Sequence, residues 1–158
     1  MFVDSRLEFV TGREPDGRLA ICRSDEFGLG VQALVDAPQG AVLDRFTGMI
    51  GSEITQHSLQ VSPGIHISET RFIGYLTHGC APNCHLDMVR FELVALRDIA
   101  AGELLTIDYA ETEDLLHVQF PCYCGADECR RWITGRLDAI DANGLAHIAM
   151  LAPPSRTA

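Results

Sequence analysis

The sequence has no lysine, and its twelve basic residues, all arginine, are outnumbered by 22 acidic residues. The chain therefore offers no lysine side chain of its own for modification, and its formal net charge at pH 7 is −10. An acidic surface repels phosphate backbones, so this composition disfavours direct binding of nucleic acid. It would attract a basic peptide and speed the encounter, although acidity also serves simply to keep a protein soluble.

Long apolar runs are also absent, and no stretch of about 18 apolar residues predicts a membrane-spanning helix. The first ten residues, MFVDSRLEFV, lack the charged-then-apolar pattern of a signal peptide. We therefore expect no membrane association and an intracellular, cytoplasmic protein, with the nucleus or host chromatin as the alternative location. In a reducing compartment the six cysteines are expected to be free thiols or metal ligands rather than disulfides.

What is present fits one domain. A chain of 158 residues, 47% of them hydrophobic, is long enough to bury a single core. Residues 7–22 predict a short hairpin around the turn-rich segment GREPDG. Residues 33–46 and 95–108 share Ala, Leu, Asp, Gly and Leu at a constant offset of 62 residues, and both predict strand, turn, strand. Residues 51–64 are polar and turn-rich.

Helical signals are few and are confined to the last third of the chain. Residues 113–118 predict one helical turn with Thr112 as its N-cap. Residues 137–150 carry a partial helical period of apolar side chains, which the pair Asn143-Gly144 is expected to interrupt.

Two cysteine clusters lie far apart in the sequence. Cys80 and Cys84 bracket the short turn GCAPNC, and a second segment, PCYCGADEC, holds three more cysteines at 122, 124 and 129. Three thiolates need a fourth ligand to close a tetrahedral zinc site. The two clusters therefore indicate one site in space, with a set of buried free thiols as the alternative.

Four motifs together resemble the SET-domain protein lysine methyltransferases, and they come in the order of that family. Residues 78–84, HGCAPNC, resemble its Asn-His-Ser-Cys-x-Pro-Asn-Cys signature, and residues 103–109, ELLTIDY, resemble its Glu-Leu-Thr-Phe-Asp-Tyr block. Residues 122–130 resemble its post-SET zinc motif, and Gly28-Leu29-Gly30 with Val31 resembles its Gly-x-Gly strand. A lone Gly-x-Gly would equally fit a bulge, but the four motifs together are specific.

The resemblance implies a mostly β fold (α+β by some schemes). It implies a SET fold of several short curved sheets with a pseudoknot-like core, in which the segment ending at Tyr109 passes near the signature loop. The expected division is a SET domain over residues 1–118, with the hairpin 7–22 and a minimal insert at 51–64. A zinc-bound post-SET segment follows over residues 119–136, and a C-terminal tail over residues 137–158.

The same resemblance implies two bound groups, a structural zinc ion and S-adenosylmethionine. Zinc would be held by four cysteines, Cys80, Cys122, Cys124 and Cys129, which leaves Cys22 and Cys84 to the core. The residues carried over to the cofactor site are Gly28, Leu29, Gly30, Thr77, His78, Tyr109 and Trp132, the last covering the adenine. Thr77 departs from the family asparagine and removes an amide that would hold the methionine part of the cofactor. His78 is expected to act mainly through its backbone.

Tyr109 stands at the position of the family's catalytic tyrosine. Methyl transfer to an amine is an in-line displacement, and a tyrosine hydroxyl can orient the amine toward the methyl group. Three residues are expected to line the substrate channel: Phe46, Ile107 and Tyr75. Phe46 and Ile107 lack hydroxyls that the family carries or permits there, which predicts di- or trimethylation rather than monomethylation.

The leading functional hypothesis is S-adenosylmethionine-dependent methylation of lysine on a basic protein or peptide, histone-like or ribosomal. One alternative is that the altered channel serves a small molecule or a non-lysine group. The other is a non-catalytic module that retains the cofactor as a stabiliser, and the residues that favour it are Phe46 and Thr77.

Overall fold

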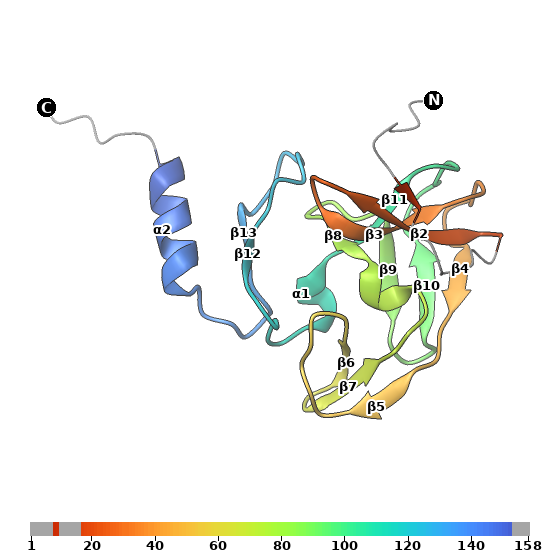
Figure 1. Cartoon of the computed structure of the whole chain (residues 1–158), viewed down its shortest axis with the longest axis horizontal. Helices are drawn as coiled ribbons and strands as arrows, with labels where there is room; N and C mark the ends of the chain where they lie inside the picture. The colour runs from red at the N-terminus through yellow and green to blue at the C-terminus, as the bar shows by residue number, and fades with distance from the viewer. Residues whose placement is uncertain (1–7, 10–16, 153–158) are drawn as a thin grey trace, which may run out of the picture.

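The computed structural model describes residues 8–9 and 17–152. These residues form mostly short strands arranged in four small sheets (Figure 1). The strands are β1 (Glu8–Phe9), β2 (Leu19–Ser24), β3 (Gly28–Ala33), β4 (Val42–Arg45), β5 (Met49–Gly51), β6 (Leu59–Ser62), β7 (Ile65–Ser68), β8 (Thr77–His78), β9 (Cys84–Asp87), β10 (Glu92–Ala95), β11 (Leu104–Ile107), β12 (Phe120–Pro121) and β13 (Trp132–Ile133). The helices are a 3₁₀ turn, η1 (Ile73–Tyr75), and two α-helices, α1 (Tyr109–Thr112) and α2 (Ala142–Leu151). The predicted mostly β fold of several small sheets is confirmed.

The largest sheet has the order β1-β2-β3-β11-β8 and carries the centre of the core. Strand β1 pairs with β2 in antiparallel fashion, as the predicted hairpin requires, while Leu7 and most of the hairpin turn lie outside the described residues. The side chains of Leu19 and Ile21 in β2 and of Val31 in β3 are buried. Leu105 of β11 packs into the same cluster, so this sheet places β11 against the hydrophobic core.

The two segments that share a sequence pattern lie side by side. Residues 33–46 contain the end of β3 and all of β4, and residues 95–108 contain the end of β10 and all of β11. Ala37 and Ile99, which occupy equivalent positions in the two segments, exchange both backbone hydrogen bonds at 2.8 Å. The prediction that both segments are β is confirmed, and their turns pair with each other.

The signature loop and the strand before Tyr109 are joined by a parallel pairing. In it, Thr106 and Ile107 of β11 lie opposite Thr77 and His78 of β8. The buried Asn83 completes the junction, because its side chain donates to the carbonyl of Leu104 and accepts the backbone N–H of Thr106. Segments almost thirty residues apart are thereby held together, as the predicted pseudoknot-like core requires.

Residues 49–68, which include the predicted insert 51–64, form the three-stranded sheet β5-β7-β6 at the bottom of Figure 1. It is attached to the body where Gly74 of η1 meets His57. An added Cβ at Gly74 would lie 2.3 Å from the carbonyl oxygen of His57, so only glycine permits this approach.

Two helical expectations were wrong in position. Helix α1 precedes residues 113–118 and is capped by Asp108, whose side chain accepts the N–H of Ala110, so Thr112 ends this helix and does not begin one. Helix α2 includes Asn143 and Gly144 in its first turn, because the Asp141 side chain accepts the N–H of Gly144. Among the described residues, no helix combines the length and the apolar character needed to cross a bilayer.

Candidate functional site

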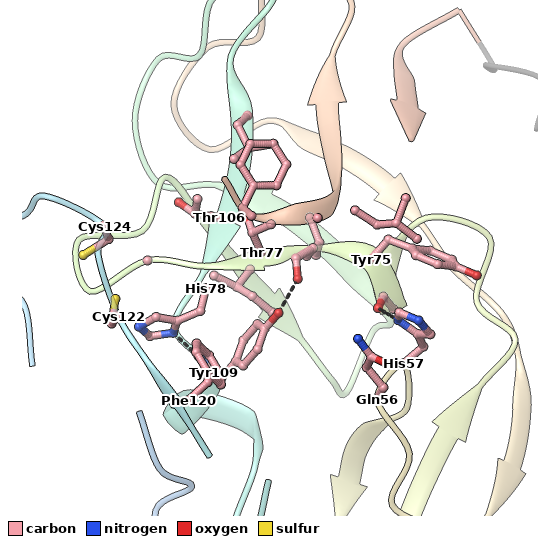
Figure 2. A pocket seen from close by; sticks show the side chains of 18 of the residues that line it. Gln56, His57, Tyr75, Thr77, His78, Thr106, Tyr109, Phe120, Cys122 and Cys124 are labelled. Atoms are coloured by element: carbon pink, nitrogen blue, oxygen red, sulfur yellow. Dashed lines mark hydrogen bonds between the residues drawn. The ribbon is translucent and has the colours of Figure 1, made fainter. Parts of the chain in front are cut away.

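A cavity of about 1500 Å³ opens between the insert, the five-stranded sheet and the segment that follows α1 (Figure 2). It is lined from the start of β3, from η1 and β8, from the end of β11 and from the segment after α1. Nine residues predicted from the sequence to form the site line it: Gly28, Leu29, Tyr75, Thr77, His78, Ile107, Tyr109, Cys122 and Cys124. The structure thus gathers residues from positions 28 to 124 around one space.

Three residues predicted for the cofactor site or the substrate channel do not line this cavity. Gly30 serves close packing, because an added Cβ would lie 2.8 Å from Leu104 Cδ1. Phe46 is buried in the core, with its ring edge-on to Phe91 at a centroid distance of 5.6 Å. The structure therefore does not bring Phe46 to the channel for which it was predicted.

Trp132 is not among the residues that line the cavity, and it packs against α2. Its indole N–H donates to Gln119 Oε1 at 2.9 Å, and its ring lies 5.5 Å from that of His147 in α2. Gly144 makes this contact possible, since an added Cβ there would lie 2.4 Å from Trp132 Nε1. The predicted role of Trp132 over an adenine ring does not match this position. Phe120, which the sequence reasoning missed, lines the cavity instead.

Tyr109 begins α1 with its ring inside the cavity. Its hydroxyl donates to the backbone carbonyl of Leu76 at 2.6 Å, as the dashed line in Figure 2 shows. Burial, followed by the nearby Glu113 carboxyl, raises the pKa of Tyr109 to about 12. The phenol therefore stays protonated at neutral pH and acts as a hydrogen-bond group rather than as a base.

Three aromatic rings pack edge to face beside the hydroxyl. The ring centroids of His78 and Tyr109 lie 5.3 Å apart, and Phe120 lies 6.0 Å from His78 and 5.8 Å from Tyr109. Each such pair of rings contributes about 0.5–1.5 kcal/mol to stability beyond the effect of burying apolar surface. A signal for Phe120 did exist, because it is an aromatic residue two positions before the cysteine motif.

The His78 side chain is almost fully buried, with 1% of it exposed. Burial lowers the pKa of His78 to about 4, an effect that Asp108 opposes and Arg130 supports. The ring is therefore neutral at pH 7. Its neighbour Thr77 uses its hydroxyl to donate to the carbonyl of Leu105, within the parallel pairing.

The opposite wall of the cavity comes from the insert. The rings of His57 and Tyr75 lie 4.5 Å apart at a tilt of 33°, and His57 Nδ1 lies 2.9 Å from the carbonyl oxygen of Gly74. Because a carbonyl only accepts, Nδ1 carries a hydrogen and donates it to Gly74. Gln56 lines the same wall. Nothing in the local sequence pattern singled out His57 or Gln56.

Four cysteines converge where the signature loop meets the C-terminal segment. The Sγ atoms of Cys80, Cys122, Cys124 and Cys129 all lie within 4.8 Å of one another, and those of Cys80 and Cys122 are 3.9 Å apart. A tetrahedral zinc with Zn–S bonds of about 2.3 Å separates its sulfurs by roughly 3.8 Å. The donor set and its spacing therefore fit zinc.

The other two cysteines lie outside this cluster. Cys22 and Cys84 are both fully buried in the core. Burial raises the pKa of the Cys84 thiol to about 12, and it also raises the pKa of Cys22. Both are therefore packed thiols, as the sequence predicted.

Comparison with known proteins agrees with this arrangement. The model of the SET domain family matches residues 28–110. The methyltransferase flvH of Aspergillus flavus is 31% identical over 127 residues, covering 78% of this chain and 71% of that protein. Human histone-lysine N-methyltransferase 2D is 31% identical over 137 residues, covering 72% of this chain but 2% of that much longer protein.

Two solved structures share the fold. The crystal structure of KRYPTONITE with mCHG DNA and SAH superposes with a TM-score of 0.60 at 26% identity, covering 74% of this chain and 29% of that one. The complex of KRYPTONITE with mCHH DNA, an H3(1–15) peptide and SAH gives 0.59 at 25% identity, covering 81% and 30%. The chain thus spans less than a third of these structures.

Proposed function

Since the chain belongs to the SET-domain family of methyltransferases, we propose that it transfers a methyl group from S-adenosylmethionine to lysine of a basic protein. The observation that carries the proposal is the Tyr109 hydroxyl, held against the Leu76 carbonyl inside the cavity. Family membership supplies the reaction class, and the relatives named as histone-lysine methyltransferases support lysine as the acceptor.

We assign the cofactor to the side of the cavity formed by β3, β8 and the segment after α1. Gly28, Leu29, Thr77 and the backbone of His78 would hold it there, in keeping with the SAH named in both neighbouring structures. Phe120 is the better candidate than Trp132 for contact with the adenine, because only Phe120 lines the cavity. S-adenosylmethionine bound there would supply a methyl group on a positively charged sulfur.

The chain's own residues would orient the acceptor. The Tyr109 hydroxyl donates a hydrogen bond to the backbone carbonyl of Leu76. The lone pairs of its oxygen are therefore free to accept a hydrogen bond from the substrate amine. Lysine has a reference pKa of about 10.4, so the amine must lose a proton to water before it attacks. The Tyr109 oxygen would then hold the neutral amine with its lone pair directed at the methyl group that the bound cofactor would supply.

Ile107 bears on the proposed degree of methylation. This residue lines the cavity and has no hydroxyl that could hold the amine or a water molecule in place. We propose that Ile107 leaves space for an amine that is already methylated, so that di- or trimethylation is favoured. Phe46 adds nothing to this argument, because it lies in the core.

The acceptor class rests on charge. A net charge of −10 draws cationic segments toward the protein, as a histone-like or ribosomal substrate requires. That the chain does not bind nucleic acid directly stays a prediction. The KRYPTONITE structures are complexes with DNA, but this chain covers less than a third of each of those protein chains.

A second candidate function has one observation in its favour. The Aspergillus flavus relative, of which the chain covers 71%, is named only as a methyltransferase, without lysine or histone. A small molecule or a non-lysine group is therefore the alternative acceptor.

The test combines cofactor binding with transfer. Zinc-loaded wild-type protein and the Tyr109→Phe variant are titrated with S-adenosylmethionine by calorimetry. They are then given histone, ribosomal-protein and small-amine acceptors with labelled cofactor. We expect micromolar binding by both proteins, and transfer to lysine that is reduced on the order of 100-fold or more in the variant.

Three results would redirect the proposal. Transfer to small amines alone would support the second candidate, and binding without any transfer would support a non-catalytic module. No binding at millimolar cofactor, with zinc content and circular dichroism intact, would overturn methyl transfer altogether.

A further inference from the structure

The His78 ring lies between the cysteine cluster and Tyr109 and contacts both. Its Nδ1 lies 3.2 Å from the backbone nitrogen of Tyr109, the first residue of α1. Its Nε2 lies 3.3 Å from Cys80 Sγ. Figure 2 shows the ring between Tyr109 and the cysteine-bearing segment. One side chain thus touches a predicted metal ligand and the backbone of the predicted catalytic residue.

The direction of each hydrogen bond follows from the chemistry of the partners. A backbone N–H can only donate, so Nδ1 accepts from Tyr109 and carries no hydrogen. An imidazole ring carries at least one N–H, so the hydrogen sits on Nε2, which faces Cys80 Sγ at 3.3 Å. The guanidinium of Arg130, 3.4 Å from Nε2, is therefore a neighbour without a hydrogen bond to this ring.

Arg130 provides a second contact between the same two segments. Its backbone N–H lies 3.4 Å from Cys80 Sγ, so this sulfur faces two N–H donors. Its guanidinium donates to Asp108 Oδ1 at 2.5 Å, and Asp108 caps the helix that Tyr109 begins. Arg130 therefore links the cysteine cluster to the cap of α1 through its backbone and its side chain.

We propose that the His78 side chain is a positioning residue that couples metal binding at Cys80 to the placement of Tyr109. Its Nε2–H stabilises the Cys80 thiolate as a zinc ligand, while its Nδ1 fixes the backbone at the start of α1. The proposal rests on the proposed function only in so far as it takes Tyr109 to be the catalytic residue. It does not need methyl transfer to be tested.

Two substitutions separate the two halves of the ring. His78→Asn keeps a side-chain oxygen near the position of Nδ1 but removes the donor to Cys80. His78→Gln reaches the position of Nε2 with an N–H donor but leaves Tyr109 without its acceptor. His78→Leu removes both, and His85→Leu, on β9 outside the cavity and the cysteine cluster, controls for the loss of a histidine from the same segment.

The measurements are zinc release to a chelator and hydrogen exchange of the Tyr109 amide by NMR, on full-length zinc-loaded protein. We expect zinc affinity to fall about 10-fold or more in the Asn and Leu variants and to be largely retained in the Gln variant. Amide exchange at Tyr109 should accelerate in the Gln and Leu variants and not in the Asn variant. The His85→Leu protein should match wild type in both measurements.

The opposite results would overturn the coupling. Equal zinc affinity in wild type and in the Asn and Leu variants would remove the role toward Cys80. Equal losses of zinc and of amide protection in the Asn and Gln variants would show a structural role only. ¹⁵N spectra that place the ring hydrogen on Nδ1 of the wild type would contradict the assigned direction of both bonds. None of these readings depends on whether the protein transfers a methyl group.

Discussion

At the scale of single residues, the carboxyl of Glu113 is unusual because it is buried beside the cavity. It accepts the backbone N–H of Gln60 at 2.9 Å and the hydroxyl of Thr112 at 3.0 Å. Burial raises the pKa of Glu113 above its ordinary value of 4.5, while these two hydrogen bonds oppose the rise. The folded state therefore favours the protonated carboxyl.

The raised pKa of Glu113 makes the stability of the fold depend on pH. A raised pKa contributes stability below pH 4.5, and that contribution is lost as the pH rises through the raised value. Glu113→Gln keeps an acceptor oxygen for both donors and does not ionise. We expect the wild type to lose free energy of unfolding relative to this variant between pH 4.5 and 7.5, measured by urea titration. Parallel profiles would contradict the assignment, and Glu111→Gln, exposed on α1 two residues earlier, serves as the control.

The sequence predicted those site residues that fall within motifs, and it failed for isolated aromatic residues. Tyr109, His78 and Cys80 each fall within a motif of fixed spacing, so their close approach could be anticipated. Phe46 and Trp132 could not be placed, because an aromatic side chain fits a core or a cavity wall equally well. Long-range packing against Phe91 and against α2 decided their positions.

At the scale of elements, α2 is held to the body largely through Trp132. The helix has no Asp, Glu, Lys or Arg among its ten residues, and Gly144 is its buried residue. Its partners are the two strands β12 and β13 of the cysteine-bearing segment, next to which it lies in Figure 1. Since Trp132 is the only tryptophan of the chain, its fluorescence reports directly on whether α2 is docked.

We predict that Gly144→Ala displaces this helix. The added Cβ would lie 2.4 Å from Trp132 Nε1 and 2.6 Å from Ile140 Cγ2, which opposes the gain of about 1 kcal/mol that alanine brings to a helix. Overpacking of this kind costs about 1–3 kcal/mol, so the clash should prevail. The emission maximum of Trp132 should shift to the red and acrylamide quenching should increase. Ala146→Ser, exposed on the same helix, should leave both unchanged, and an unshifted Gly144→Ala spectrum would refute the docking role.

The elements were predictable where periodicity and turn chemistry agreed. The segments 33–46 and 95–108 were recognised as strands because apolar residues flank an Asp-initiated turn in each. The helix expected at residues 113–118 forms instead at Tyr109–Thr112, because Asp108 supplies the cap that Thr112 was expected to give. Cap residues are frequent in this stretch, and sequence alone does not rank them.

At the scale of the whole molecule, the cysteine cluster joins the signature loop to the C-terminal segment more than forty residues later. Closing so long a loop restricts the unfolded chain, and metal binding to a site formed only on folding adds directly to stability. Zinc should therefore stabilise the fold as a whole and complete the cavity wall that Cys122 and Cys124 help to form.

We expect one zinc ion per chain by elemental analysis. Its removal by a chelator should lower the melting temperature by on the order of 10 °C and abolish binding of S-adenosylmethionine. Cys124→Ser should lose the metal, whereas Cys22→Ala, which removes a core thiol, should retain it. A Cys124→Ser protein with full zinc occupancy would show that the cluster is not the metal site.

The parallel pairing of β8 with β11 also governs how the chain reaches its native state. On its other edge β11 pairs with β3, whose residues Val31 and Gln32 were synthesised long before it. Neither contact is local, so the entropy of closing two long loops must be lost before either pairing stabilises the chain. Folding should accordingly take milliseconds to seconds rather than microseconds. A nascent chain that has not yet passed Cys129 lacks one of the four clustered cysteines, so the cluster can form only after all the strands of the large sheet have been synthesised.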